Sequence, residues 1–514
     1  MWGFILIPMS FSKVYSAQTN LLKAHIIDIE VDISKGLHHF SVVGLPDKAV
    51  EESRDRVSAA IKNSGFKSPK SNQGKIVIAL APADIKKEGP KFDLGIALAY
   101  LLATDKTNFD PASKIFLGEL SLDGKLRRIK GVLPLVREAK RQGFQEVYLP
   151  KENVLEGALI EGITIYGVED LKQVLNHLDT NSQEEIQPQP LTKIKYTNSE
   201  YLIDFADIKG QETAKRGLEI AAAGGHNIAM YGPPGTGKTM LAKAFCHILP
   251  QLSFEDVLEV TSIHSVAGVL DKNMIIQPPF RSPHHTSSHV SIVGGGTFPK
   301  PGEVTLAHKG VLFVDEFPEF DRRVIDSLRQ PLEDKIISIS RAKGSAIFPA
   351  NFILIAAMNP CPCGNYKSNK ECICPPASIS RYERKISGPI VDRIDMWVEV
   401  SNIYHKKLLE KTFNGDKTDI IKGRVISARN KQIKRLGSSK TNSDMGARDI
   451  ESFIQLSPEV KDILNKSAQQ FGLSARAYHK IIKLSRTIAD LDNSEEIKVN
   501  HLLEALQYRP KSSL

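Results

Sequence analysis

The chain has 514 residues, 41% of them hydrophobic, which allows three or four domains with buried cores and excludes a peptide hormone, a disulfide miniprotein and a disordered tail. Its 68 Lys and Arg against 59 Asp and Glu give a net charge of +9. From residue 401 to the end there are 21 basic and 13 acidic residues. Most of the excess positive charge therefore lies in the last fifth of the chain, which indicates an anionic partner there.

The number of cysteines and the length of the apolar runs indicate the cellular compartment of the protein. Five cysteines are too few for a disulfide framework. No run of about 18 apolar residues occurs, and the apolar opening residues 1–8 lack the basic start and the cleavage site of a signal peptide. Met9 is an alternative start to Met1, because strand-like sequence begins just after it. We expect a cytoplasmic protein with no membrane partner.

Residues 1–178 alternate short apolar runs with helical periodicity, which predicts one α/β domain. The expected strands lie at Ile26–Ile33, Ile76–Leu80, Ile115–Leu122 and Glu146–Leu149, and the expected helices at Ala49–Asn63, Phe92–Leu102 and Leu133–Gln142. Residues 179–199 hold three acids, two prolines and many small polar residues. This composition predicts a linker.

Residues 200–402 predict a parallel sheet with crossover helices. Short β-rich runs at Ile228–Tyr231, Val311–Val314 and Ile353–Ala357 are separated by helical stretches. Residues 403–514 show amphipathic helical periodicity and no convincing strand. We therefore expect the last domain to be all α.

A phosphate-binding loop is predicted between the strand Ile228–Tyr231 and a helix at Met240–Ile248. Its sequence fits G-x-x-x-x-G-K-[ST], in which glycines allow backbone N–H groups to surround a polyphosphate. Lys238 is expected to meet the β- and γ-phosphates and Thr239 to bind Mg²⁺. The predicted nucleotide-binding residues are Gly232, Pro233, Pro234, Gly235, Thr236, Gly237, Lys238 and Thr239.

A second motif, Gly310–Glu316, is an apolar strand that ends in two acids. Asp315 is expected in the Mg²⁺ shell and Glu316 beside the attacking water, because phosphoryl transfer depends mostly on positioning and charge neutralisation. Taken alone, the motif is better explained as an ordinary strand followed by a solvated acidic turn. Its pairing with the Lys238 loop favours a nucleotide site.

Three further polar residues are candidates for the γ-phosphate environment. Asn359 ends the third β-rich run, where a side chain at the carboxyl edge of a sheet can reach a ligand. Arg393 lies in Gly388–Asp395, and Arg476 lies in Leu473–Ala477. Taken singly, each arginine is more simply explained as half of a surface ion pair.

In this order the motifs resemble those of AAA+ ATPases. The resemblance implies that Asn359 is the sensor-1 residue, that Arg393 is an arginine finger, and that Arg476 is the sensor-2 residue on an all-α lid. The segment that holds Ile208 and Gln211 resembles the adenine-side segment of the family.

More narrowly, nearly the whole chain resembles the magnesium-chelatase-like ComM/YifB family. The matching motifs are Phe280–His285, Val293–Gly296, Pro301–Val304, Met358–Gly364 and Leu473–His479, with Val43–Pro46 and Gly118–Gly124 in the first domain. The resemblance implies a ring, expected to be a hexamer, in which Arg393 reaches the nucleotide of the neighbouring subunit. Such an arginine contributes about 10³ to 10⁵ in rate. Whether Arg476 acts within its own subunit or across the interface stays open.

The segment Gly118–Asn153 also resembles the proteolytic domain of Lon proteases, closely so at Leu149–Asn153. Lon proteases need a serine nucleophile and a lysine base. The serine region aligns with Gly89–Gly95, which contains no serine, and the lysine position falls near Pro134. Without an activated nucleophile there is no acyl transfer, so we expect a Lon-like fold that serves assembly or nucleic-acid contact instead.

Four cysteines lie within fourteen residues, in the pattern Cys361-x-Cys363-x₈-Cys372-x-Cys374. Four thiolates satisfy a tetrahedral Zn²⁺, although this spacing is tighter than the usual C-x₂-C. We expect a closed structural zinc site; a plain turn or a redox pair is the alternative. His284, His285 and His289 are other possible ligands, but polar loop histidines are the simpler explanation.

The segment Lys422–Lys440 holds seven basic residues and no acid, and the inserted region His264–Glu303 is the candidate for a substrate-gripping loop at a ring's channel. The DNA-contact candidates are Lys300, Lys422, Arg424, Arg429, Lys431, Lys434 and Arg435. On charge alone a solvated helical face is an equal explanation. No aromatic residues are interleaved for base stacking.

The resemblance implies an ATP-driven ring motor on branched or single-stranded DNA, which promotes branch migration in homologous recombination or natural transformation. Two other functions fit the ATPase motifs: a chelatase subunit that drives Mg²⁺ insertion into a porphyrin, and a protein-remodelling ATPase. The four-cysteine insertion and the Lon-like domain argue against a chelatase subunit.

Overall fold

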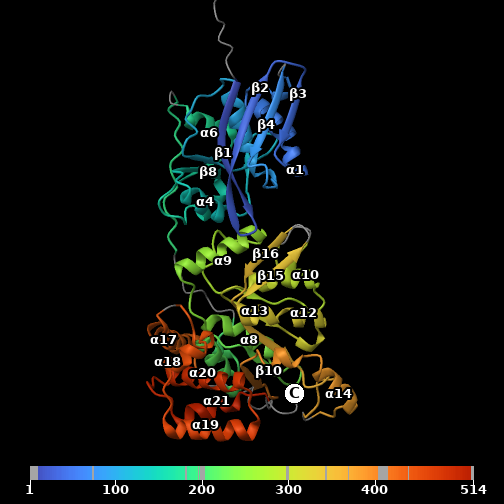
Figure 1. Cartoon of the computed structure of the whole chain (residues 1–514), viewed down its shortest axis with the longest axis vertical. Coiled ribbons are helices and arrows are strands. Elements are labelled where there is room, and N and C mark those ends of the chain that lie inside the picture. Colours follow the sequence, from blue (N-terminus) through green and yellow to red (C-terminus); the bar gives the residue numbers. More distant parts are fainter. Residues whose placement is uncertain are drawn as a thin grey trace, which may run out of the picture. The chain divides into compact units, whose positions relative to one another are not determined.

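The computed structural model describes most of the chain (Figure 1). The described residues are 10–71, 74–179, 182–194, 196, 203–296, 300–341, 344–367, 370–402, 415–437 and 439–510. Both possible starts, Met1 and Met9, lie outside them. The chain forms two compact units, Met1–Lys195 with Val257–Ile275, and Tyr196–Asp256 with Ile276–Leu514.

The first unit is an α/β fold on a seven-stranded sheet of order β3-β4-β2-β1-β5-β8-β9. The β1–β2 and β2–β4 pairs are antiparallel and the other neighbours are parallel. The strands are β1 (Ser10–Asn20), β2 (Lys23–Ser34), β3 (His39–Val43), β4 (Lys75–Ala81), β5 (Lys114–Phe116), β6 (Glu119–Leu120), β7 (Leu126–Arg127), β8 (Glu146–Pro150) and β9 (Thr164–Val168). The helices are α1 (Lys48–Glu51), α2 (Ser53–Asn63), α3 (Asp93–Ala103), α4 (Val132–Arg141), α5 (Val154–Gly157) and α6 (Leu171–Leu178).

Hydrophobic patterning explains the two main helices of this unit. Helix α3 is apolar on nearly all sides and almost completely buried, as a helix enclosed by a core should be. Helix α4 is amphipathic: it buries Val132, Leu135 and Val136, and two of its basic residues, Lys140 and Arg141, lie in its last turn.

The expected helices and most of the expected strands are present, and the strand-like sequence after Met9 forms β1. Two expected elements are divided: the strand at Ile115–Leu122 into β5 and β6, and the helix at Ala49–Asn63 into α1 and α2. The elements β3, β7, β9, α5 and α6 were not foreseen.

Two segments outside the predicted first domain belong to this unit. Residues 182–194 of the predicted linker are bonded to it, since the Gln189 N–H donates to the Ile165 carbonyl at 2.8 Å. The chain also returns to the unit at Val257–Ile275, where the Ser265 hydroxyl oxygen accepts from the Gly131 N–H at 2.9 Å. Helix α9 (Phe254–Ala267) therefore begins in the second unit and lies mostly in the first.

The second unit contains a five-stranded, all-parallel sheet of order β11-β14-β17-β10-β18. The strands of the unit are β10 (Ile228–Tyr231), β11 (Phe280–Arg281), β12 (Gly294–Gly295), β13 (Lys300–Pro301), β14 (Val311–Val314), β15 (Ile336–Arg341), β16 (Gly344–Pro349), β17 (Ile353–Met358) and β18 (Met396–Glu399). The helices around this sheet are α7 (Glu212–Gly224), α8 (Lys238–Ile248), α10 (His289–Val293), α11 (Glu303–Leu306), α12 (Arg322–Ser327), α13 (Arg329–Asp334), α14 (Pro376–Glu383) and α15 (Gly388–Val391). Strands β14 and β17 are buried along their whole length, which explains their unbroken apolar sequences and confirms the expected parallel core.

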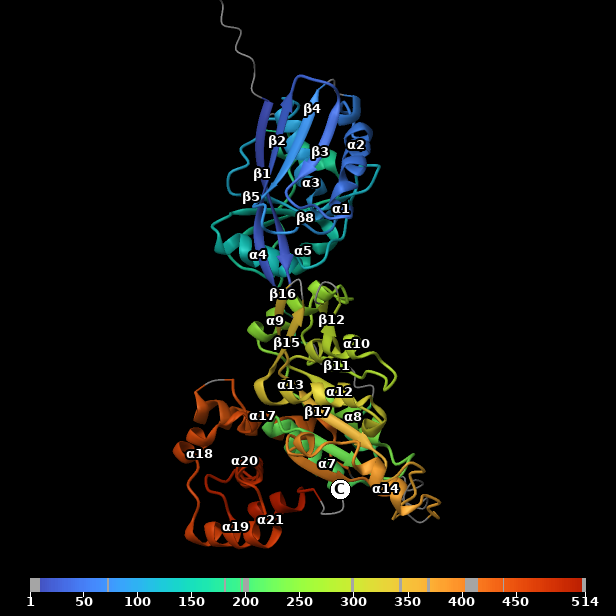
Figure 2. The same cartoon turned by 45° about the vertical axis from the view of Figure 1, so that its right-hand side comes forward.

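In the described residues after the core, the long elements are all helices. They are α17 (Thr418–Leu436), α18 (Ala447–Phe453), α19 (Pro458–Phe471), α20 (Ala475–Leu491) and α21 (Val499–Gln507), and Figure 2 shows them grouped at the lower left. The helical C-terminal region agrees with the sequence expectation. Among the described residues, every helix falls short of the length or the apolar character needed to cross a lipid bilayer.

The helical region contains a buried polar network centred on Asp490. The Asp490 carboxylate, 1% exposed, accepts hydrogen bonds from Arg435 at 3.1 Å and from Asn442 at 2.9 Å, and it lies 3.1 Å from the Arg486 guanidinium. Two arginines thus depend on one carboxylate to balance their charge.

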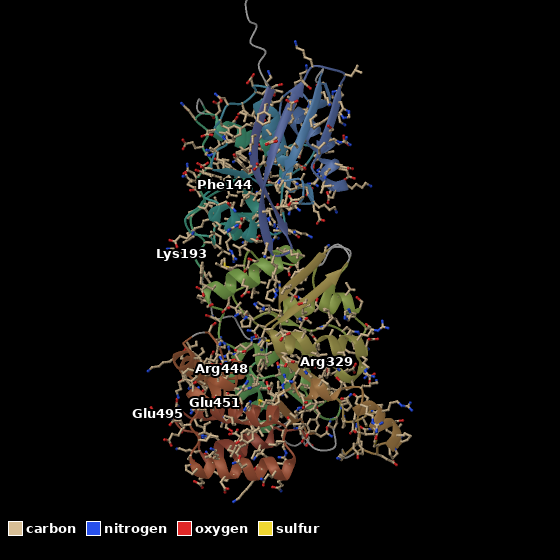
Figure 3. The ribbon with its side chains drawn as sticks, viewed as in Figure 1. Phe144, Lys193, Arg329, Arg448, Glu451 and Glu495 are labelled. Atoms are coloured by element: carbon tan, nitrogen blue, oxygen red, sulfur yellow. The ribbon has the colours of Figure 1, made fainter. Side chains whose placement is uncertain are left out.

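We predict that Asp490→Ala lowers the free energy of unfolding by about 3 kcal/mol or more, because it leaves Arg435 and Arg486 without their buried counter-charge. Chemical denaturation of the full chain measures this. The matched control is Glu451→Ala, an exposed position on α18 (Figure 3), for which we expect a change within about 0.5 kcal/mol. Equal effects of the two substitutions would contradict a structural role for the network.

Candidate nucleotide site

The predicted phosphate loop lies between β10 and the start of α8. Gly237 is the N-cap of α8 and has a φ of +88°, a left-handed conformation that glycine adopts without strain. Helix α8 begins at Lys238, so its first backbone N–H groups point toward the loop. A loop that ends on a helix N-terminus in this way provides the donors that a phosphate needs.

The Lys238 amino group lies inside this loop. Its Nζ donates to the carbonyl oxygens of Gly232 at 2.7 Å and Pro233 at 2.9 Å, and to the Oδ1 of Asn359 at 3.2 Å. Burial lowers the pKa of Lys238 to about 8, and the nearby Asp315 carboxylate opposes this shift. The structure thus brings the predicted phosphate lysine to the predicted sensor at the end of β17.

The acidic motif that follows β14 contacts helix α8 at the residue after Lys238. The Thr239 hydroxyl donates to Asp315 Oδ2 at 2.9 Å, and Asp315 Oδ1 accepts from the Glu316 N–H at 2.9 Å. Hydroxyl and carboxylate oxygens are ligands that suit Mg²⁺. The chain therefore places the two predicted magnesium ligands in direct contact.

Glu316 has a neighbour that the sequence did not reveal. Its Oε2 lies 3.2 Å from the Nδ1 of His285, and the imidazole of His284 lies against that of His285 with ring centroids 4.2 Å apart. From the sequence, these histidines were expected to be polar loop residues, with zinc ligation as the alternative. The structure places His285 beside the predicted catalytic carboxylate instead.

The predicted adenine-side segment also reaches the loop. Ile208 is 2% exposed within the core of the unit. The side-chain amide of Gln211 donates to the carbonyl oxygens of Thr236 at 3.3 Å and Ser401 at 2.6 Å. Gln211 therefore ties the start of α7 to the phosphate loop.

The two predicted arginines converge on one carboxylate, Glu333 of α13. Arg476 donates to Glu333 Oε1 at 2.5 Å, and Arg393 donates to Glu333 Oε2. Burial alone would raise the pKa of Glu333, but the hydrogen bonds from Arg476 and Arg393 hold this pKa below its usual value. Glu333 could not be predicted from the sequence, because nothing in the sequence of α13 marks it.

Most of the basic residues of α17 bind groups of their own unit. Arg424 pairs with Glu219 and Asp416, and Arg429 donates to the Ala222 carbonyl at 2.7 Å. The other two such residues are Lys431, which donates to Asn493, and Arg435, which pairs with Asp490. These contacts favour the structural explanation of the basic run. A DNA contact at the exposed Lys300 and Lys434, and at the half-buried Lys422, stays a prediction.

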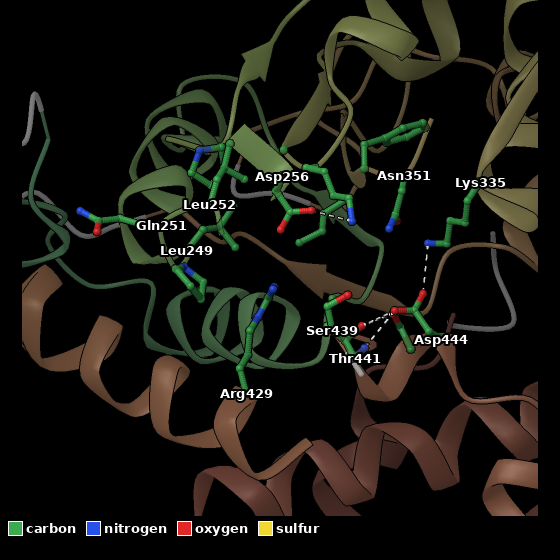
Figure 4. Close-up of a pocket in the computed structure, with 18 residues that line it drawn as sticks. Leu249, Gln251, Leu252, Asp256, Lys335, Asn351, Arg429, Ser439, Thr441 and Asp444 are labelled. Carbon is green, nitrogen blue, oxygen red and sulfur yellow. Dashed lines mark hydrogen bonds and ion pairs between the residues drawn. The ribbon is translucent and has the colours of Figure 1, made fainter. Parts of the chain in front are cut away.

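A hollow lies at the amino-terminal edge of the sheet, where Gly310 precedes β14 and Ile353 begins β17 (Figure 4). Lys309 lies 2.9 Å from Asp256, and Lys335 lies 3.7 Å from Asp444. Since these charged groups pair with one another, we assign this hollow no ligand.

The four clustered cysteines come together in space. One sulfur atom from each lies within 4.8 Å of all the others. Cys361 is buried and the other three are half-buried. This donor set and spacing fit the tetrahedral thiolate coordination of a structural Zn²⁺.

Comparison with known proteins identifies relatives that match nearly the whole chain. The model "Subunit ChlI of Mg-chelatase" matches residues 29–153, "Magnesium chelatase, subunit ChlI" matches 204–408, and "Magnesium chelatase, subunit ChlI C-terminal" matches 415–509. The Competence protein ComM of Haemophilus influenzae is 41% identical over 507 residues, which cover 98% of each chain. The Uncharacterized protein YifB of Escherichia coli K12 is 42% identical over 504 residues, 98% of this chain and 97% of that protein.

The chain belongs to the magnesium-chelatase-like ComM/YifB family. This confirms the family resemblance deduced from the motifs. Family membership supports an AAA+ ATPase that uses ATP and Mg²⁺. A partial match, 30% identical over 146 residues, covers 27% of this chain and 26% of Lon protease 2 of Bacillus subtilis. That match gives weak support to a Lon-like domain in this ComM/YifB-family protein.

We predict that nucleotide affinity falls as the pH rises through about 8. Phosphates favour the protonated Lys238, and the lowered pKa means that the nucleotide-free protein loses this charge above about pH 8, so affinity falls by up to about tenfold per pH unit. Titration with a fluorescent ATP analogue between about pH 7.5 and about pH 9.5 measures the slope. Lys238→Arg stays charged over this range and is the control. The same slope in both proteins would rule out Lys238 as its source.

A second pair of substitutions separates binding from hydrolysis. Lys238→Ala should abolish ATP binding, whereas Glu316→Gln should bind ATP normally and hydrolyse it about 10² times more slowly or worse, because it removes a proton acceptor near the attacking water. Binding titrations and a phosphate-release assay distinguish the two. Unchanged hydrolysis by Glu316→Gln would refute the role given to Glu316.

Proposed function

We propose that this ComM/YifB-family protein is an ATP-driven ring motor that moves on DNA and promotes branch migration of recombination intermediates. The observation that carries the proposal is the meeting of Lys238 with Asn359, and of Thr239 with Asp315, at one edge of the sheet. The near full-length match to a protein named for competence supports a DNA substrate and a role in natural transformation or recombination.

Each side chain of the site has a role in this proposal. Lys238 binds the β- and γ-phosphates and neutralises charge that develops on them. Thr239 and Asp315 hold Mg²⁺, which supplies further charge neutralisation when bound. Glu316 accepts a proton from the attacking water, and Asn359 orients that water or the γ-phosphate.

The proposed assembly is a hexameric ring in which Arg393 reaches the nucleotide of the neighbouring subunit. Because Arg393 and Arg476 share the Glu333 carboxylate, a phosphate that one of them reaches is within reach of the other. We therefore propose that Arg476 serves the same neighbouring nucleotide as Arg393. Glu333 balances both guanidinium groups in the single subunit.

The remaining parts have supporting roles. The four cysteines hold a structural Zn²⁺. The first unit serves assembly or nucleic-acid contact without proteolysis, because the sequence region that aligns with the Lon serine contains no serine and the Lon lysine position falls near Pro134. Lys300, Lys422 and Lys434 are the proposed DNA contacts that the structure leaves at or near the surface. The proposed location is the cytoplasm.

A second candidate function is that of a magnesium-chelatase subunit whose ATPase cycle drives Mg²⁺ insertion into a porphyrin. The three matching family models, all named for the chelatase subunit ChlI, favour it. The DNA motor remains the better proposal because one of the proteins that match the chain over almost their entire length is a competence protein.

The deciding experiment is the ATPase rate with forked, single-stranded and duplex DNA across a salt series. The motor proposal predicts the strongest stimulation by branched DNA, with a log–log salt slope of the DNA affinity near −0.9 for each duplex phosphate neutralised. Lys300→Glu is expected to weaken the stimulation, and Glu451→Ala is the control. No response to any DNA, together with stimulation by a porphyrin, would favour the chelatase function.

The proposed sharing of each nucleotide site between two subunits can be tested in mixed rings. Arg393→Ala should lower ATP turnover by about 10³, because it removes a charge that stabilises the transition state from the neighbouring subunit. Mixing it with Lys238→Ala subunits should restore part of the turnover, because some interfaces then hold an intact Lys238 and an intact Arg393. Turnover that is equally fast in monomers and rings would contradict this arrangement.

A further inference from the structure

The thiol cluster lies directly beside the nucleotide site in the chain. Cys361 follows Asn359 by two residues, and Asn359 accepts a hydrogen bond from Lys238. The Cys361 sulfur also accepts from the Tyr366 N–H at 3.3 Å, which is the contact expected of a thiolate held by a metal. The residue bonded to the Lys238 amino group is therefore only two positions from the first thiol of the cluster.

The other end of the first cysteine pair touches the phosphate loop itself. Gly364, directly after Cys363, has a φ of +79°, and its N–H donates to the Cys361 carbonyl at 2.9 Å. A Cβ atom at Gly364 would lie 2.6 Å from the Cδ of Pro234, closer than two carbon atoms can approach. The backbone of the cysteine turn therefore packs directly against the loop.

We propose that Cys361, Cys363, Cys372 and Cys374 hold one Zn²⁺, and that this metal fixes the position of Asn359 and of Pro234, so that tight nucleotide binding requires the metal. The segment from Asn359 to Gly364 contacts the phosphate loop through its first and its last residue. Its conformation is set by two of the four thiolates. The inference rests on the proposed nucleotide site and adds a metal requirement to it.

The coupling has a simple physical basis. A metal that joins Cys361 and Cys363 to Cys372 and Cys374 closes a loop and removes conformations in which the turn moves away from Pro234. Without the metal these conformations are populated, and part of the binding free energy of the nucleotide is spent on ordering the turn. The metal therefore acts on affinity without touching the nucleotide.

The test uses the full chain and measures zinc content and the affinity for a non-hydrolysable ATP analogue side by side. We expect one zinc per chain in the parent. Removal of zinc by a chelator should weaken analogue binding by about tenfold or more, and added Zn²⁺ should restore it, which excludes irreversible unfolding as the cause. Cys372→Ser should behave like the chelated parent, and Cys246→Ala, which alters the cysteine of α8 outside the cluster, should change neither quantity.

A variant with intact thiols tests the contact itself. Gly364→Ala should bind the analogue more weakly, because the added methyl group displaces Pro234 and because alanine is strained at a φ of +79°. Its zinc content is measured in parallel, and a zinc-loaded variant with unchanged affinity would overturn the contact. A parent without zinc would overturn the metal site, and zinc loss with unchanged affinity would overturn the coupling. A parent that holds zinc but binds no analogue would overturn the proposed nucleotide site together with the coupling, and would leave the metal site standing.

Discussion

The position of one amino group, that of Lys238, determines what the second unit can do. A buried lysine without a carboxylate partner at hydrogen-bond distance is costly, and here carbonyl oxygens of the loop and the Asn359 amide share its protons. These partners come from the ends of two neighbouring parallel strands, and the third, β14, brings Asp315 to the adjacent Thr239. The parallel sheet is what places these groups at one edge.

Local signals made the central part of this site predictable. Strands β10 and β14 have the bounds expected from their apolar runs, and the glycine at position 237 has the left-handed conformation that the motif requires. The strands β11 and β18 escaped prediction, because the two residues of β11 carry too little pattern and the apolar run of β18 stops after three residues at the exposed Glu399. The return of Val257–Ile275 to the first unit was equally hidden, because α9 continues without a break across the boundary.

Long-range pairing was the part that sequence could not supply. The meeting of Arg393 and Arg476 at Glu333 joins residues 60 and 143 positions away from that carboxylate. The same holds for His285 beside Glu316, and for the basic residues of α17, whose partners lie on other elements. Charge and spacing predicted which residue types matter, but their partners follow only from the packing of the unit.

The measurement that tests the central claim most directly is an experimental structure with a non-hydrolysable ATP analogue and Mg²⁺. The account predicts the β- and γ-phosphates at the N-terminus of α8, with the Lys238 amino group moved from the loop carbonyls onto them. It also predicts the metal ion between Thr239 and Asp315. A loop still closed on its own lysine, with the analogue bound elsewhere or absent, would contradict it.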